Sequence, residues 1–130
     1  MSNSSTCLSC KSETESLSHL FYYCPNAKYL WTQLETKIKN STNFSVNFTP
    51  MDTLLGYTLN NSNASAINVI LLVTKTYMYK TSRKFKIYCI EDVVNLIEKT
   101  YTEQRLAAKL DLMEQKYDQT WHQMKLIFLK

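Results

Sequence analysis

A near absence of glycine and proline constrains this chain more than any other feature of its sequence. Its 130 residues contain one Gly and two Pro. Sandwiches and barrels need many tight turns, and those turns depend on residues that accept a positive φ or supply a fixed one. The sequence therefore predicts an all-α protein in which polar loops join the helices.

Apolar residues at three- and four-residue spacing locate the expected helices. Asn26 is a candidate N-cap for a helix that carries Trp31. Residues 49–52 combine Thr at the N-cap, Pro at the first helical position and an acid in the first turn, and Gly56 is expected to end that short helix. A central helix over residues 64–79 carries apolar side chains on most faces, so we expect it to be largely buried.

A stripe of apolar residues near the C-terminus predicts one further amphipathic helix. The members follow steps of three or four residues, in the order Leu106, Leu110, Met113, Tyr117, Trp121, Met124 and Phe128. Packing within the domain explains such a stripe, and docking on another protein surface is the alternative. No apolar run approaches the roughly 18–20 residues of a membrane span, so we expect no membrane partner.

Three cysteines and a histidine near the N-terminus predict a zinc site. Cys7, Cys10, His19 and Cys24 have the spacing C-x2-C-x8-H-x4-C. Four such ligands close a tetrahedral shell, so we expect one structural Zn²⁺ with no position open for catalysis. An ideal α-helix would place His19 and Cys24 about 140° apart, so they converge only if the helix ends between them. Two buried thiols beside a surface histidine are the alternative.

The remaining cysteine and histidine are not expected to bind the metal. Cys89 lies in an apolar context and is predicted to be a small core residue. His122 has no partner ligand nearby and is predicted to be either a surface histidine or one whose hydrogen bonds are satisfied within the protein. Residues 1–6 lack the basic and apolar regions of a signal peptide, so we expect a reducing intracellular setting, where cysteines favour metal over disulfides.

Positive charge is concentrated in residues 75–86. The whole chain has a formal charge of +4, whereas this segment has five basic residues and no acid, so the remainder sums to −1. Lys and Arg neutralise phosphates, and aromatic rings offer flat faces to unpaired bases. Residues 80–86 are predicted to form a polar, basic loop. The alternative is that this loop is merely solvated, with Tyr77 and Phe85 in the core. The candidate nucleic-acid contacts are Lys75, Tyr79, Lys80, Arg83, Lys84, Phe85, Lys86 and Tyr88.

A longer motif surrounds the cysteines. After the pair Cys7 and Cys10, residues 15–25 read Glu-Ser-Leu-Ser-His-Leu-Phe-Tyr-Tyr-Cys-Pro, and Leu-Trp follows at 30–31. This motif resembles the zinc-binding domain that follows the reverse transcriptase in LINE-type (non-LTR) retrotransposon proteins. The helices beyond it resemble the C-terminal tail of those proteins only in pattern. The resemblance implies a CCHC module with its following helix over residues 1–39, and a helical region over residues 40–130 that packs with it as one unit.

The resemblance also implies a non-catalytic role in nucleic-acid binding. Such segments contact the element RNA, or the target DNA, while a nicked target primes reverse transcription, and they act within the parent reverse transcriptase protein. The expected location is a ribonucleoprotein in the cytoplasm and nucleus. The only adjacent acid pair, Glu91-Asp92, fits the first turn of a helix better than a polymerase site, so we expect no enzyme. A structural or protein-interaction module, docking on the parent protein or on a second copy, is the alternative, and the choice between RNA and DNA stays open.

Overall fold

The computed structural model describes residues 16–57, 63–84 and 86–128. No strand occurs within these ranges, so the expectation of an all-α fold is confirmed for the described part of the chain. The expected zinc module lies partly outside them, because Cys7 and Cys10 precede residue 16. The elements are the π-helix η2 (His19–Tyr23), the α-helices α1 (Pro25–Thr42), α2 (Pro50–Leu55), α3 (Ala64–Arg83), α4 (Ile90–Leu110) and α5 (Glu114–Thr120), and the 3₁₀-helix η3 (Met124–Ile127).

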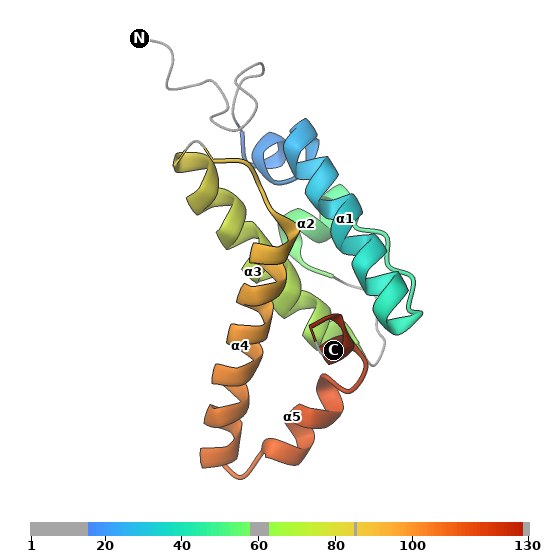
Figure 1. Cartoon of the computed structure of the whole chain (residues 1–130), viewed down its shortest axis with the longest axis vertical. Helices are drawn as coiled ribbons and strands as arrows, with labels where there is room; N and C mark the ends of the chain where they lie inside the picture. Colours follow the sequence, from blue (N-terminus) through green and yellow to red (C-terminus); the bar gives the residue numbers. More distant parts are fainter. Residues whose placement is uncertain (1–15, 58–62, 85, 129–130) are drawn as a thin grey trace.

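The helix α3 runs through the middle of the molecule (Figure 1). It packs against α4 on one side and against η2 near its C-terminal end, while η3 packs on α1. The helix α5 turns back from the far end of α4 (Figure 1). None of the described helices is both long and apolar enough to cross a bilayer.

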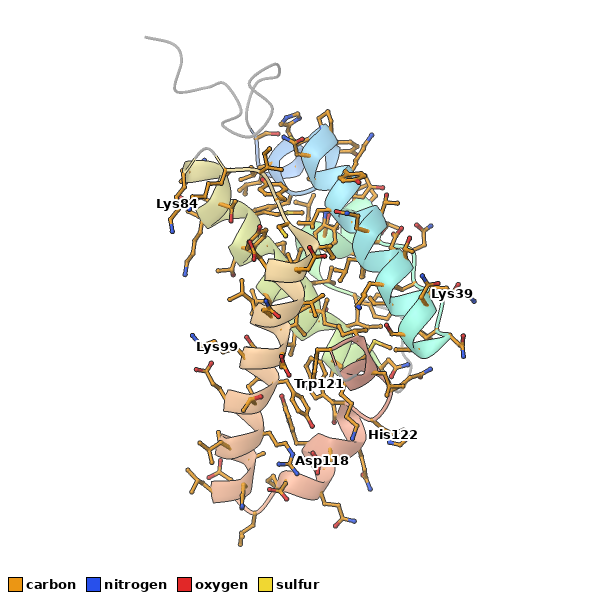
Figure 2. All side chains as sticks on the ribbon, in the orientation of Figure 1. Lys39, Lys84, Lys99, Asp118, Trp121 and His122 are labelled. Atoms are coloured by element: carbon orange, nitrogen blue, oxygen red, sulfur yellow. The ribbon has the colours of Figure 1, made fainter. Side chains whose placement is uncertain are left out.

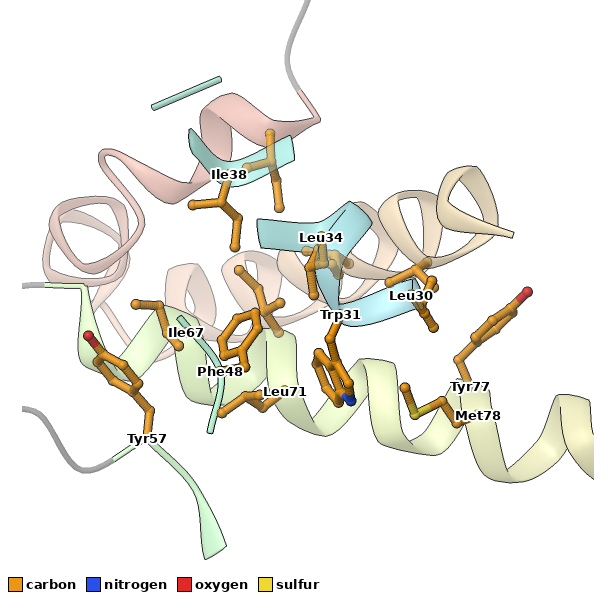
Figure 3. Close-up of a cluster of buried hydrophobic side chains, with 14 of the residues drawn as sticks. Leu30, Trp31, Leu34, Ile38, Phe48, Tyr57, Ile67, Leu71, Tyr77 and Met78 are labelled. Atoms are coloured by element: carbon orange, nitrogen blue, oxygen red, sulfur yellow. The ribbon is translucent and has the colours of Figure 1, made fainter. Parts of the chain in front are cut away.

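One apolar core joins the helices around Trp31 (Figure 3). The indole ring lies 5.2 Å from the ring of Phe48, which follows α1 in the chain. The backbone of Phe48 is fixed in turn, because its N–H donates to the Glu35 carboxylate at 2.7 Å. The core members labelled in the close-up are Leu30, Trp31, Leu34, Ile38, Phe48, Tyr57, Ile67, Leu71, Tyr77 and Met78.

The helix boundaries follow local chemistry. The predicted Asn26 cap is wrong, since α1 begins at Pro25 with Cys24 at the N-cap. Proline suits that first position because its φ is fixed and it has no N–H to leave unpaired. The start of α2 is confirmed: Thr49 Oγ1 accepts from the Asp52 N–H at 3.2 Å, and Asp52 Oδ2 accepts from the Thr49 N–H at 3.0 Å. Gly56 ends α2 with φ 103°, as its position predicts.

The single C-terminal helix predicted from the apolar stripe is wrong. The helix α4 ends at Leu110, and Leu112 takes a positive φ of 60° before α5 begins. The stripe is divided accordingly, because Trp121 is 1% exposed whereas Leu110 is 79% exposed. Only the second half of the stripe, from Trp121 to Phe128, belongs to the core.

An aromatic cluster and an ion pair explain why the chain folds back. The ring of Tyr101 in α4 lies 5.3 Å from Trp121 and 5.2 Å from Phe128. Arg105 donates to both carboxylate oxygens of Asp118, from Nε at 2.8 Å and from Nη2 at 3.2 Å. A continuous helix would carry Trp121 away from Tyr101, so burial of the indole favours the turn over the uninterrupted pattern.

Cys89 and His122, the two residues not expected to bind the metal, both lie outside the buried core. Cys89 is half-buried, so its predicted place in the core is wrong; its Sγ lies 3.4 Å from a Glu91 carboxylate oxygen at the start of α4. His122 is exposed, which agrees with the first of its two predicted states. The acids Glu91 and Asp92 occupy the first turn of α4, which is also the predicted place.

The divided stripe yields a stability prediction. Trp121→Ala removes a fully buried ring and should lower the free energy of unfolding by about 3–5 kcal/mol. Leu110→Ala, from the same sequence stripe, removes an exposed side chain and should change it by about 0.5 kcal/mol or less. Urea unfolding monitored by circular dichroism measures both. A large loss for Leu110→Ala would contradict the turn at residues 111–113.

Candidate zinc turn and nucleic-acid interface

His19 and Cys24 lie at the two ends of one hydrogen-bonded turn. The Cys24 N–H donates to the His19 carbonyl oxygen at 2.7 Å, which closes the five-residue π-helix η2. The sequence predicts that His19 and Cys24 converge only if a helix ends between them. The structure meets this condition, because η2 ends at Tyr23 and the backbone of Cys24 has left the helical conformation, with ψ 132°.

Both residues of the turn suit a metal ion chemically. The side chains of His19 and Cys24 are buried, at 8% and 0% exposure, and imidazole and thiolate are the ligands that structural zinc prefers. Cys7 and Cys10 lie outside the described residues. Within residues 16–57, 63–84 and 86–128, no group of three or more His, Cys, Asp or Glu side chains is placed to hold a metal. By side-chain chemistry alone, His19 and Cys24 could supply two of the four ligands that the sequence predicts.

The turn is held to the core by Trp31. Its indole N–H donates to the Phe21 carbonyl oxygen at 2.6 Å, inside η2. The backbone of this π-turn therefore has a fixed partner in α1. The side chain of Phe21 faces α3, where it lines a shallow pocket of about 320 Å³ together with Lys75 and Tyr79.

Most of the basic segment forms the C-terminal turns of α3, so the loop predicted over residues 80–86 is wrong as far as Arg83. The helix continues to Arg83, and Lys84 is its C-cap. Positive charge at a helix C-terminus is favourable because the last carbonyl groups carry a partial negative charge. The helical conformation also divides the basic residues into rows at four-residue spacing.

One row carries Lys75, Tyr79 and Arg83. The guanidinium of Arg83 lies over the Tyr79 ring, 4.4 Å from its centroid, a cation–π contact that keeps the ring oriented. The Tyr79 side chain remains 48% exposed. This ring is the candidate stacking surface that the structure leaves most accessible among the described residues of the segment.

The second row carries Lys80 and Lys84, which face α4. Both line a groove of about 720 Å³ between α3 and α4. Lys99 of α4 lines the same groove, and Figure 2 shows Lys84 and Lys99 projecting from the same edge of the molecule. The sequence prediction missed Lys99 because that residue lies among the acids of α4, and only the packing of α4 on α3 brings it to the basic face.

The other predicted contacts differ in accessibility. Lys86 is exposed, and its N–H donates to the Thr81 carbonyl oxygen at 3.3 Å. Tyr88 is half-buried, with its ring 5.9 Å from that of Tyr77, so it offers less surface for stacking than Tyr79 does. Phe85 lies outside the described residues.

Tyr77 fixes the junction between α3 and α4. Its hydroxyl oxygen accepts from the Cys89 N–H at 2.8 Å, and the hydroxyl lies 3.5 Å from the Asp92 carboxylate. Burial raises the pKa of Tyr77 above its ordinary value, so the phenol stays neutral and keeps its proton at neutral pH. This junction positions Lys84 and Lys99 on the two sides of the same groove.

Lys75 yields a prediction about pH. Burial lowers the pKa of its ammonium group below the ordinary 10.5. Between the lowered pKa and 10.5 the unfolded chain binds more protons at this position than the folded chain, so this residue makes stability rise with pH there. Lys75→Met should therefore flatten that rise relative to the parent. Urea midpoints measured through the alkaline range test this, and parallel pH profiles for the parent and Lys75→Met would contradict it.

Comparison with known proteins assigns no family to this geometry. No family model, curated protein or solved structure matches the chain. The resemblance to the retrotransposon zinc-binding domain therefore depends on the motif residues alone, and the function it implies is a proposal.

Proposed function

We propose that this chain is a non-catalytic, zinc-containing nucleic-acid-binding segment of a LINE-type reverse transcriptase protein, with RNA as its main ligand. The observation that carries the proposal is the exposed C-terminal end of α3. It presents the basic residues of the segment beside the accessible ring of Tyr79, and residues 75–86 contain no acid to oppose them. In the parent protein this segment assists recognition of the template RNA, or of the target DNA, during target-primed reverse transcription, within a ribonucleoprotein of the cytoplasm and nucleus.

The proposed contacts divide by chemistry. Four residues approach phosphates, because binding there releases counterions from the nucleic acid; they are Lys80, Arg83, Lys84 and Lys86. Tyr79 stacks on an unpaired base, with Arg83 already covering part of the ring. A ring held by a cation–π contact loses little side-chain entropy when a base arrives, which favours binding.

The zinc ion has a supporting role in this proposal. Three thiolates and one Zn²⁺ give a site with a net charge of about −1, which repels phosphates and does not anchor them. Closing the shell around His19 and Cys24 would fix η2, and η2 presents Phe21 to the basic row of α3. Zinc thereby stabilises a segment too small to bury a core of its own.

A second candidate function is supported by a separate surface. Leu106, Leu110, Leu112 and Met113 are 60%, 79%, 92% and 46% exposed at the corner between α4 and α5. Exposed apolar residues that gather at one corner are typical of protein-interaction sites. In this alternative the chain docks on another part of the parent protein, or on a second copy, through that corner. Binding of this kind depends weakly on salt, whereas nucleic-acid binding falls steeply with it.

The zinc assignment predicts one metal ion per chain. Cys24→Ser removes a thiolate and should reduce the zinc content after dialysis well below one equivalent, with loss of order around η2. Cys89→Ser is the matched control, because Cys89 is no predicted ligand, and it should retain the full equivalent. Elemental analysis by plasma mass spectrometry measures both. Full zinc retention by Cys24→Ser, or no zinc in the carefully purified parent, would overturn the assignment.

The nucleic-acid proposal predicts a change in salt dependence. Replacing Arg83, Lys84 and Lys86 with Ala should flatten the slope of log affinity against log salt by about 2, because each phosphate contact to a single strand contributes about 0.7. The control variant replaces Lys39, Lys109 and Lys116, three exposed lysines outside the basic segment, and should keep the parent slope. Fluorescence anisotropy with labelled single-stranded RNA at several salt concentrations gives the slopes. Equal slopes for the parent and the first variant would refute the basic segment as the contact.

A further inference from the structure

The groove between α3 and α4 combines charge and apolar surface in a way that the basic segment alone does not predict. On α3, the residues that line it follow two adjacent rows at four-residue spacing, and the outer row runs from Leu72 through Thr76 and Lys80 to Lys84. On α4, Lys99 lines the opposite side. Each α-helical step of four residues advances about 6 Å, so the lysines are spread along the groove and do not form one cluster.

The floor of the groove is apolar and accessible. Leu72 and Leu96 line it and remain 64% and 38% exposed. Val73 and Tyr77 also line the groove; Val73 is half-buried, and the Tyr77 hydroxyl is already engaged by the Cys89 N–H. This aliphatic surface is left uncovered by the described part of the chain, and a flat apolar face could cover it.

The charge of the groove is positive and available. Lys80, Lys84 and Lys99 form no ion pair within the described residues, where the ion pairs run from Arg105. Among the described residues, Asp92 is the one acid that lines the groove, and its carboxylate lies 3.5 Å from the Tyr77 hydroxyl. The groove therefore favours an anionic ligand along its rim.

We propose that this groove binds single-stranded nucleic acid, with phosphates on Lys80, Lys84 and Lys99 and base faces on Leu72 and Leu96. The inference rests on the proposed function. It adds Lys99 as a contact and specifies that the bound nucleic acid is single-stranded. A duplex keeps its bases paired and stacked behind the phosphates, so its bases cannot reach the floor while the phosphates contact the rim. An unpaired strand can place its bases on the apolar floor while its phosphates contact the lysines.

The groove also adjoins the shallow pocket that Tyr79 lines. Leu72, Thr76 and Lys80 line both the groove and the shallow pocket that contains Phe21 and Tyr79. A strand lying in the groove can thus continue over Lys80 toward the exposed ring. The result is one path that crosses α3, from Lys99 on α4 to Tyr79.

Lys99 supplies the direct test. The probe is a fluorescein-labelled, mixed-sequence RNA strand of about 12 nucleotides, within the range that single-strand-binding modules cover. One lost contact should weaken binding about 5-fold near 0.1 M salt and flatten the slope by about 0.7. We expect this for Lys99→Ala, while Lys99→Arg should stay within about 2-fold of the parent because it keeps the charge. Lys39→Ala, on the opposite side of the molecule in Figure 2, should match the parent.

Two further measurements test the floor and the strand. Leu96→Ser should weaken binding with an unchanged salt slope, because it removes apolar contact and no charge. The same RNA annealed to its complement should bind more weakly than the free strand, and Lys99→Ala should affect it less. A circular dichroism melt confirms that each variant is folded before binding is measured.

The outcomes separate this inference from the function on which it rests. If Lys99→Ala binds like the parent while the Arg83, Lys84 and Lys86 variant is weakened, the groove is refuted and the nucleic-acid function stands. If the parent itself binds no RNA, the function fails. Equal binding of strand and duplex, with the same loss in Lys99→Ala, would overturn the single-strand assignment. Binding of a Glu-rich amphipathic peptide in place of RNA, with sensitivity to Lys99→Ala, would assign the groove to a protein ligand instead.

Discussion

The indole of Trp31 is the contact on which the rest of the structure depends. Its ring packs beside Phe48 in the core, and its N–H binds the Phe21 carbonyl oxygen inside η2. One side chain thus ties the π-turn, α1 and the segment before α2 to the same apolar centre that receives α3. A buried indole needs a partner for its N–H, and the partner it finds lies in the turn that contains His19 and Cys24.

This arrangement couples the two parts of the proposed function. The π-turn positions two candidate zinc ligands on its backbone, and its Phe21 side chain lies against the row of α3 that carries Lys75 and Tyr79. The core packing of α3 leaves its basic rows outside, one toward η2 and one toward α4. In this proposal the zinc ion does not contact the nucleic acid. We propose that the ion would fix the turn, and that the turn would support the helix proposed to bind phosphates.

Local chemistry allowed much of the fold to be predicted, whereas the candidate site needed tertiary structure. The capping box at Thr49 is encoded within four residues, so the pattern was sufficient. The apolar stripe through Trp121 was not sufficient to predict the turn before α5. Its periodicity carries no information about the Tyr101 ring, against which Trp121 packs. Lys99 escaped prediction for the same reason, since its place beside Lys84 comes from the packing of α4 on α3. The π-turn at His19 likewise depends on a distant indole.

The most direct test of the account is an NMR titration of the zinc-loaded protein with a short single-stranded RNA. The account predicts that backbone amide shifts gather in the second half of α3 and around Lys99 in α4, including Tyr79 and Lys84. It also predicts that the amide resonances of His19 and Cys24 keep the chemical shifts of the folded turn until zinc is removed. After zinc removal, the RNA-induced chemical-shift changes in α3 should become smaller. Shifts confined to the exposed corner at Leu110 and Leu112, or unchanged RNA binding after zinc removal with η2 still ordered, would contradict it.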